Sequence, residues 1–434
     1  MFNNFYFLNR IINKNKSVIK NSFWLFLEKL IRVVFGLLVG AWVARYLGPL
    51  EFGELAYTLA LVNLLQAIAI MGLEGIVVRD IAVDKSKAAE ILGTAVAVRF
   101  ICGASIWLVA ILITAYLDGF DSRSTILMAL IGTSLLFQSA DVIDLWFQSQ
   151  SQNKRGVFSR ITAHIVTNGF KIILIILKFE LIMFAWLIAC ESLIIAMLLI
   201  YAYKKYPCKY TIFATINMAK KLVNEGWIYM ASGISIIIYM RIDQLIIKKY
   251  LGTYELGVYA ATIQLATAWQ FFPIAISGVL APYLASLKIN SEEGYRSSIR
   301  KIFSAFSLMG WIISIFVCLT SSIIVELLYG AKYESGINVI RIYAFTNLFI
   351  CLGVAQGLWI MNERKALMGL YKTIIGATIC IVGNIILIPM YGLIGVAIVA
   401  VLSQAGSAIL SNIIFSKKIL YLQLKSIIAP YRFL

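Results

Sequence analysis

Apolar stretches of about 20 residues recur from one end of this chain to the other, the length that an α-helix needs to cross the roughly 30 Å hydrocarbon core of a bilayer. The composition agrees, because 61% of the 434 residues are hydrophobic and 14% are charged. A soluble domain is nearer half apolar and a quarter charged. A transmembrane barrel would instead show short segments of alternating polarity. We therefore expect an all-α polytopic membrane protein.

Hydropathy predicts twelve spans, at about 20–45, 54–78, 91–116, 125–148, 157–177, 181–203, 222–247, 257–282, 300–325, 337–360, 367–388 and 393–415. With a cytoplasmic N-terminus, 26 Lys and Arg residues fall on the cytoplasmic side and six on the opposite side. Short loops rich in Lys and Arg stay in the cytoplasm. We expect the cytoplasmic (inner) membrane, with both termini cytoplasmic. The net charge of +17 is then a topology signal with some attraction to membrane lipids, and we do not expect nucleic acid as a partner.

Three smaller features exclude other classes. The N-terminal MFNNFYFLNRIINKNKSVIK lacks the cleavage site of a signal peptide and predicts a short interfacial helix with Phe2, Phe5, Phe7 and Leu8 facing lipid. Six scattered cysteines have no metal-ligand spacing, so we expect packing roles and no metal site. We interpret the single histidine, His164, as a packed or hydrogen-bonded residue, with a proton relay as the alternative.

An eight-residue phrase occurs twice, as YLGPLEFG at Tyr46–Gly53 and YLGTYELG at Tyr250–Gly257, 204 residues apart. A weaker third copy, LLYGAKYESG, occupies Leu327–Gly336. The two strong copies link the first and second spans of each six-span half. Matching first hairpins in parallel orientation predict two pseudo-symmetric six-helix lobes, as in a transporter whose substrate path lies between its halves.

Each copy predicts a tight turn, because glycine adopts backbone conformations closed to other residues. We expect Gly53 and Gly257 just before the next helix, with Glu51 and Glu255 close to its positive N-terminal end. The expected organisation is an N-terminal lobe over 1–203, a basic cytoplasmic linker over 204–221, a C-terminal lobe over 222–415 and a cytoplasmic tail over 416–434.

Three segments carry a family likeness. WLFLEKLIRVVFGLLVGAWVARYLGPLEFGELAY, RIDQLIIKKYLGTYELGVYAATIQL and LLYGAKYESGINVIRIYAF resemble, in order and spacing, the polysaccharide-biosynthesis membrane proteins, the O-antigen flippases (Wzx type). The resemblance implies the fold of the multidrug/oligosaccharidyl-lipid/polysaccharide (MOP) exporters, with two six-helix lobes around a central cavity. It also implies a function, the movement of an undecaprenyl-diphosphate-linked oligosaccharide from the inner to the outer leaflet. Other polysaccharide-assembly membrane proteins are possible partners under this interpretation.

Ionisable side chains inside a span cost several kcal/mol unless they have a partner, so each is a candidate functional residue. The basic candidates for binding the substrate diphosphate are Arg32, Lys171, Arg241 and Arg341. Arginine suits this role because its fork binds phosphate bidentately. Glu28 and Arg32 are spaced i, i+4 and can pair. For Arg341 and Arg99 we favour snorkelling to the nearer helix end.

The fourth span carries a polar stripe that consists of Ser134, Gln138, Asp141, Asp144 and Gln148. On a regular helix these residues share about a third of the circumference, and such a stripe must face protein or water. Ser134, Gln138 and Gln148 are therefore predicted to line the cavity. The candidates for ion coupling, or for structural pairing with a neighbouring helix, are Glu28, Asp141, Asp144 and Asp243. Both roles stay open at this point.

No nucleotide-binding motif occurs, so a proton or sodium gradient is the expected driver, without a cofactor. A multidrug or cation antiporter of the same fold is the main alternative, although its cavity would be acidic rather than basic. A membrane polysaccharide polymerase or ligase is a further alternative. We do not expect an enzyme, because the predicted outer loops are short and present no paired carboxylates.

Overall fold

The computed structural model describes residues 16–208 and 211–431, and within these ranges every regular element is a helix. The expectation of an all-α chain is confirmed. The interfacial helix expected around Phe2 to Leu8 lies outside the described residues.

Among the described residues, nine helical segments are long and apolar enough to cross a bilayer, and α10 (Ile216–Leu251) is a tenth if its bent parts are counted together. Two of the nine are too long for one crossing, since Phe26–Val83 has 58 residues and Leu367–Phe415 has 49. In each, a glycine outside the helical region, Gly48 or Gly392, marks where one long helix ends and the next begins. If each of these two counts as two crossings and α10 counts as one, the ten segments together correspond to the twelve predicted spans.

The described chain forms two compact units. Unit 1 comprises the described residues of Met1–Val39 together with Leu61–Ile234. Unit 2 comprises Gly40–Ala60 together with the described residues of Ser235–Leu434. The helix α2 (Lys16–Ala69) therefore contributes to both units. The lobe boundaries predicted from topology stay a prediction.

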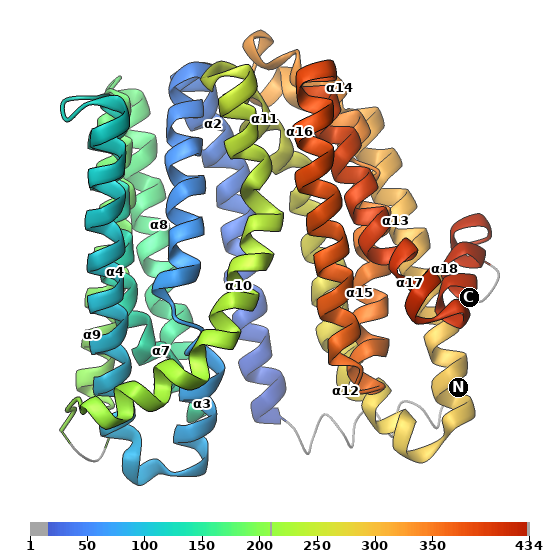
Figure 1. Ribbon diagram of the computed structural model, residues 1–434, viewed down its shortest axis with the longest axis horizontal. Helices are drawn as coiled ribbons and strands as arrows, with labels where there is room; N and C mark the ends of the chain where they lie inside the picture. Colours follow the sequence, from blue (N-terminus) through green and yellow to red (C-terminus); the bar gives the residue numbers. More distant parts are fainter. Residues whose placement is uncertain (1–15, 209–210, 432–434) are drawn as a thin grey trace. The chain divides into compact units, whose positions relative to one another are not determined.

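Unit 1 is a bundle of helices that end and begin at recognisable signals (Figure 1). Gly119, with φ of 98°, follows the last residue of one helix, and the Ser122 side chain then caps the next by accepting a hydrogen bond from the Thr125 N–H (3.2 Å). After α2, the helices of this unit are α3 (Glu74–Val83), α4 (Ala88–Asp118), α5 (Arg123–Gly132), α6 (Ser134–Phe137), α7 (Val142–Ser149), α8 (Lys154–Ile176), α9 (Leu181–Lys205) and the first part of α10, with 3-10 helices η1 (Lys85–Lys87) and η2 (Gln138–Asp141).

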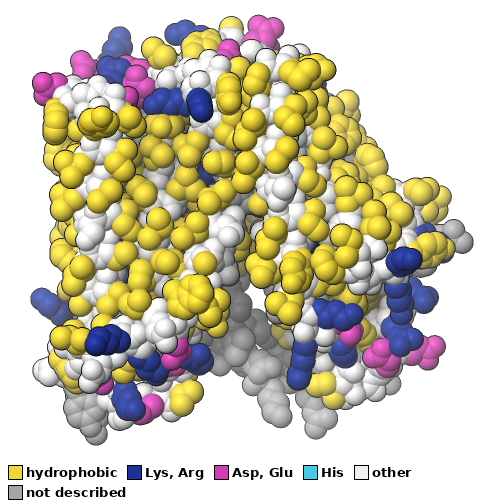
Figure 2. Space-filling model, in the orientation of Figure 1, with side chains coloured by type: hydrophobic (Ala, Val, Ile, Leu, Met, Phe, Trp, Pro, Cys, Tyr) yellow, Lys and Arg dark blue, Asp and Glu magenta, His cyan; other side chains and the backbone are white. Residues whose placement is uncertain are grey.

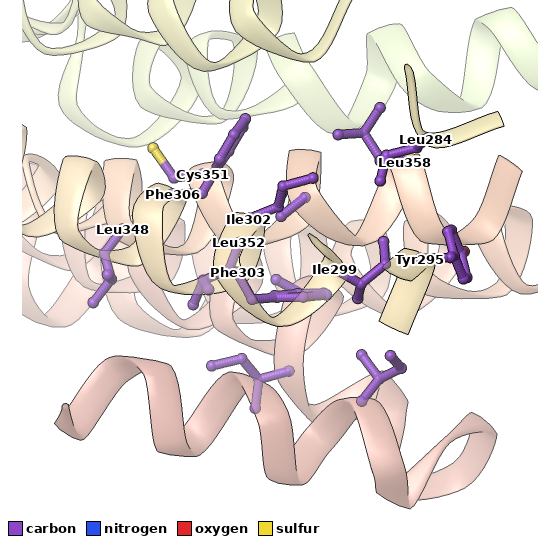
Figure 3. Close-up of a cluster of buried hydrophobic side chains, with 14 residues drawn as sticks. Leu284, Tyr295, Ile299, Ile302, Phe303, Phe306, Leu348, Cys351, Leu352 and Leu358 are labelled. Atoms are coloured by element: carbon purple, nitrogen blue, oxygen red, sulfur yellow. The ribbon is translucent and has the colours of Figure 1, made fainter. Parts of the chain in front are cut away.

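Unit 2 packs around a buried apolar cluster in which Phe303 and Phe306 meet Leu348 and Leu352 (Figure 3). Ile419 joins the same cluster, so the segment predicted as a tail contains a packed helix. The elements of this unit after α10 are α11 (Thr253–Thr267), η3 (Ala268–Gln270), α12 (Phe271–Asn290), α13 (Glu292–Leu328), η4 (Ala331–Tyr333), α14 (Gly336–Tyr343), α15 (Thr346–Asn362), α16 (Ala366–Ala405), the π-helix η5 (Gly406–Leu410), α17 (Ser411–Phe415) and α18 (Lys417–Ile428).

Three turns in unit 2 use the same backbone conformation. Gly48, Gly252 and Gly330 have φ of 75°, 94° and 81°, with ψ of 170°, 178° and 179°. This region is open almost only to glycine. Each of these glycines is followed at once by helical residues. The two copies of the phrase and its weaker third copy therefore encode one shared turn.

The second glycine of each strong copy has a different role from the one expected. Gly53 and Gly257 do not precede a helix but lie inside one. A Cβ atom at Gly53 would lie 2.0 Å from the carbonyl oxygen of Thr253, and one at Gly257 would lie 1.8 Å from the carbonyl oxygen of Pro49. The two glycines allow two helix starts to touch backbone to backbone. Glu255 falls in the first turn of α11, as predicted.

Side chains from the second and third copies tie the turns together. The Tyr254 hydroxyl donates to the carbonyl oxygen of Lys332 (3.2 Å), and the Tyr333 hydroxyl donates to the carbonyl oxygen of Ala44 (2.6 Å). All three turns thus belong to one contact region of unit 2.

Hydrophobic side chains cover the middle of the helices on the face shown in Figure 2, and charged side chains gather mostly toward helix ends. This distribution is typical of helices that cross a bilayer. Charged side chains buried along the helices therefore stand out, and unit 1 holds a group of them.

Candidate functional site

Arg160 of α8 binds two carboxylates from two other helices. Its Nε and Nη2 donate to Oε1 and Oε2 of Glu28 on α2, at 2.8 and 3.0 Å. Its Nη1 lies 2.8 Å from Oδ2 of Asp144 on α7. Glu28 and Asp144 are only 8% and 5% exposed. Three simultaneous contacts in a fixed fork need a guanidinium group, which a lysine cannot replace.

We call Arg160 with its two carboxylates, Glu28 and Asp144, the clamp. Residues near each of the three in sequence support it. Glu28 and Arg32 are one turn apart, and Arg32 Nη2 lies 3.3 Å from Glu28 Oε1, so the predicted pair is confirmed. Gln148 is one turn from Asp144 and donates to its Oδ2 at 2.8 Å. On α8, Gly156 makes room, because a Cβ atom there would lie 1.5 Å from Asp144 Oδ1. The carboxylate of Asp144 occupies the space that a side chain at position 156 would fill, so this contact with Arg160 requires glycine there.

A pocket of about 440 Å³ lies beside this clamp within unit 1. Arg99 of α4 is its most buried basic residue, only 3% exposed, and its Nε and Nη2 have no hydrogen-bond acceptor among the described residues. The snorkelling expected for Arg99 is therefore wrong, because packing in the bundle holds its side chain inside. The pocket is lined by Glu74, Gly75, Val78, Arg79, Arg99, Asp141, Asp144, Leu145, Gln148 and Arg160.

Some of the charged residues around this pocket form ion pairs with described residues, and others do not. Arg160 is matched by the clamp carboxylates, and Arg79 lies 2.7 Å from both Asp80 and Glu225. Arg99 and Asp141 form no ion pair with any described residue. They enter the pocket from α4 and η2, and Glu74 adds a second carboxylate that forms no ion pair with a described residue.

The stripe predicted on the fourth span is only partly brought together. The regular helix assumed there is wrong, because the span is divided into α5, α6, η2 and α7, and the 3-10 turn of η2 advances about 120° per residue instead of 100°. Asp141, Asp144 and Gln148 reach the pocket. Ser134 and Gln138 are half-buried and do not line it. Asp144 takes the pairing role that the sequence left open.

A second polar group in unit 1 joins α8 to α9. His164 Nδ1 lies 2.9 Å from Glu191 Oε1, and Lys171 Nζ lies 3.8 Å from Glu191 Oε2. The interpretation of His164 as a hydrogen-bonded residue agrees with this contact. Lys171, predicted to bind diphosphate, already has a carboxylate partner.

In unit 2, the candidates Arg241 and Asp243 lie two residues apart on α10, and Arg341 lies on α14. Asp243 accepts a hydrogen bond from the hydroxyl of Tyr259 on α11, so it pairs with a neighbouring helix as one of the expected roles requires. Arg241 is half-buried. Arg341 is exposed, and its Nη2 donates to the hydroxyl of Ser322 at 2.7 Å.

Sequence reasoning missed Arg160 and misjudged Arg99. Arg160 lies only three residues inside the span predicted at 157–177, where a basic side chain is typical of the cytoplasmic end of a span. Its position four residues after Gly156, on the same face of the helix, was the available signal. Burial of Arg99 depends on helices that are distant in sequence, and no local pattern reports it.

Comparison with known proteins supplies a family. A sequence-family profile described as "Polysaccharide biosynthesis protein" matches residues 42–338. The chain is similar to the capsular polysaccharide biosynthesis protein CapF of Staphylococcus aureus, with 27% identity over 180 residues that cover 41% of this chain and 45% of CapF. It is also similar to an uncharacterized membrane protein of Methanocaldococcus jannaschii, with 23% identity over 219 residues, 48% of this chain and 42% of that one. The matches span a little under half the length of these relatives.

Solved structures share the fold over nearly the whole chain. The lipid II flippase MurJ in an inward closed conformation aligns with a TM-score of 0.72 at 13% identity, covering 95% of this chain and 92% of that one. A multidrug resistance MATE family transporter of the MOP superfamily, in an inward-facing conformation, aligns with a TM-score of 0.69 at 14% identity, covering 92% and 99%. The expected two-lobe transporter fold is confirmed.

Proposed function

Because the chain belongs to the polysaccharide biosynthesis protein family, we propose that it is a flippase for an undecaprenyl-diphosphate-linked oligosaccharide. The observation that carries the proposal is the family match over residues 42–338, which joins polysaccharide biosynthesis to a fold found in transporters. The protein works in the cytoplasmic membrane with both termini in the cytoplasm, and it moves its substrate by alternating access.

The substrate diphosphate is the part that cannot enter hydrocarbon, so basic side chains inside the spans carry it. Arg32 fits this role, because its side chain is 45% exposed and, among the described residues, its contact is that of Nη2 with Glu28 at 3.3 Å. The remaining N–H groups are available for a phosphate. Arg160 holds Glu28 from the other side, which positions Arg32. Arg241 and Arg341 are further contacts, and Lys171 binds phosphate only when it leaves Glu191.

The coupling ion acts at the pocket of unit 1. Asp141 lines it without an ion-pair partner among the described residues, so its carboxylate is available to a proton or a sodium ion, whereas Asp144 is engaged by Arg160. Neutralising Asp141 removes one of the two unpaired carboxylates, Asp141 and Glu74, that line the pocket with Arg99, which ties ion binding to the electrostatics of the pocket.

A multidrug antiporter is the second candidate, favoured by the structural match to a MATE transporter. The basic residues inside the spans argue against organic cations as substrate, because like charges repel.

Complementation tests the proposal. The gene is expressed in a strain that lacks its polysaccharide flippase but makes the matching lipid-linked glycan, and surface glycan is measured. We expect wild type and Arg32→Lys to restore surface glycan, whereas Arg32→Ala, at equal abundance in the membrane, leaves the precursor in the inner leaflet. Failure of the wild type refutes the flippase assignment and moves the antiporter to first place. Full activity of Arg32→Ala refutes only the role of Arg32.

A further inference from the structure

Lys372 is the only charged residue between Lys365 and Lys417 in the sequence. It lies near the start of α16, half-buried, and its Nζ has two neutral acceptors, Gln356 Oε1 at 3.2 Å and the Gly353 carbonyl oxygen at 3.4 Å. Among the described residues it forms no ion pair. An ammonium group in a span without a carboxylate is costly and marks a candidate site.

A chain of buried amides extends from Lys372 across unit 2. Gln356 Nε2 donates to Asn412 Oδ1 (2.9 Å), and Asn412 Nδ2 donates to Gln423 Oε1 (2.8 Å). Gln423 Nε2 donates to the Ala408 carbonyl oxygen (2.9 Å). The three amides are fully buried, at 0% exposure. Because an ammonium group only donates hydrogen bonds, the Gln356 oxygen must face Lys372. This orientation fixes which group donates and which accepts in each hydrogen bond of the amide series.

The end of this chain lies in an irregular helix. Ala408 belongs to the π-helix η5, and its carbonyl oxygen accepts from the side chains of both Asn412 (3.0 Å) and Gln423 (2.9 Å). Single π-turns inside α-helices occur frequently at functional sites. The side chain of Lys372 is therefore held by a dedicated polar scaffold drawn from α15, η5, α17 and α18.

The position of Lys372 fits the polar face of a membrane. It lies six residues after Ala366, the first residue of α16, which is about 9 Å along the helix axis. Its neighbour Tyr371 is 49% exposed and stacks on Phe415, with ring centroids 5.6 Å apart. Exposed aromatic rings of this kind gather at the level of lipid headgroups.

We propose that Lys372 is an anion-binding residue that takes the phosphate group of a membrane-embedded ligand. An ammonium binds phosphate as a point charge and needs no fork, and the amide chain keeps it from turning away. The phosphate belongs either to an anionic lipid headgroup or to the diphosphate of a lipid-linked glycan. The second source rests on the proposed flippase function, and the first does not.

Binding to the full-length protein in phosphatidylcholine nanodiscs tests the proposal. The probes are spin-labelled phosphatidylglycerol and soluble inorganic pyrophosphate. We expect Lys372→Gln to weaken binding of at least one probe about tenfold or more, as loss of a charge-assisted contact requires. Lys372→Arg retains binding. The matched control Arg364→Gln removes an equal charge from an exposed loop position and leaves binding unchanged.

The pattern of losses identifies the source. Loss confined to phosphatidylglycerol indicates a headgroup site, and loss of pyrophosphate indicates a diphosphate site. Unchanged affinity of Lys372→Gln for both probes overturns the proposal.

Thermal melting separates binding from a structural role. If Lys372 serves an anion, Lys372→Gln melts at or above the wild-type temperature, because it removes a half-buried charge that has no carboxylate partner among the described residues and keeps a donor for Gln356. A melting temperature several degrees lower indicates a structural lysine and also overturns the proposal. Complementation tests the flippase function separately. If phosphate binding depends on Lys372 but the protein restores no surface glycan, the result supports this inference and refutes the flippase.

Discussion

Removal of Arg160 tests whether the clamp holds unit 1 together. Arg160→Ala deletes contacts of 2.8 to 3.0 Å and leaves Glu28 and Asp144 facing each other at 8% and 5% exposure. Loss of one partner from a buried ion pair costs about 3–5 kcal/mol. Arg32 still neighbours Glu28 and Gln148 still neighbours Asp144, so we expect a loss of about 3 kcal/mol, at the lower end of that range.

The assay is the free energy of unfolding in bicelles by steric trapping, with thermal melting as a second measurement. Arg160→Lys keeps the charge but not the fork, so it should lose less stability than Arg160→Ala. Combining Arg160→Ala with Glu28→Gln and Asp144→Asn removes the stranded charges and should recover most of the loss. An unfolding free energy of Arg160→Ala within about 0.5 kcal/mol of wild type, the range of ordinary surface substitutions, would refute the reasoning.

Two further predictions concern single contacts. Gly156→Ala places a Cβ atom 1.5 Å from Asp144 Oδ1, so we expect a loss of about 1–3 kcal/mol by thermal or steric-trap unfolding, whereas Gly169→Ala, which meets open space on the same helix, should be neutral or stabilising. Burial alone would raise the pKa of the Glu363 carboxyl, but Lys288 at 2.8 Å outweighs it and holds the pKa below its usual range. Glu363→Gln should therefore cost about 0.5–1 kcal/mol at pH 7, and the difference from wild type should fade as the pH drops below about 4.3; a difference that grows on acidification contradicts the assignment.

Hydropathy and charge bias were sufficient to predict the helical class and the twelve crossings, because the bilayer imposes length and polarity on each span separately. The same local rules fail at Arg99 and at the fourth span. Whether Arg99 snorkels or is buried depends on neighbouring helices, and the 3-10 turn that ends at Asp141 changes which side chains share a face. Long-range packing decides both, and a single sequence does not report it.

The site was only partly predictable for a related reason. Glu28 and Arg32 were found as a pair because their spacing on one helix is visible in the sequence. Arg160 and Asp144 lie on two different helices. Gly156, which permits their contact, cannot be distinguished in the sequence from the other glycines. Charge pairs between helices become visible only when the bundle is assembled.

The two copies of the repeated phrase contact each other in the folded chain. Gly53 approaches the carbonyl of Thr253, and Gly257 approaches the carbonyl of Pro49. Gly53 is equivalent to Gly257, and Pro49 is equivalent to Thr253, with 204 residues between the members of each pair. Each copy therefore supplies a glycine to one contact and a carbonyl to the other, as in a two-fold symmetric interface. A surface that binds its own copy needs the same residues on both sides. The chain therefore contains the phrase twice because its two copies are the two halves of one contact, in addition to encoding the same turn.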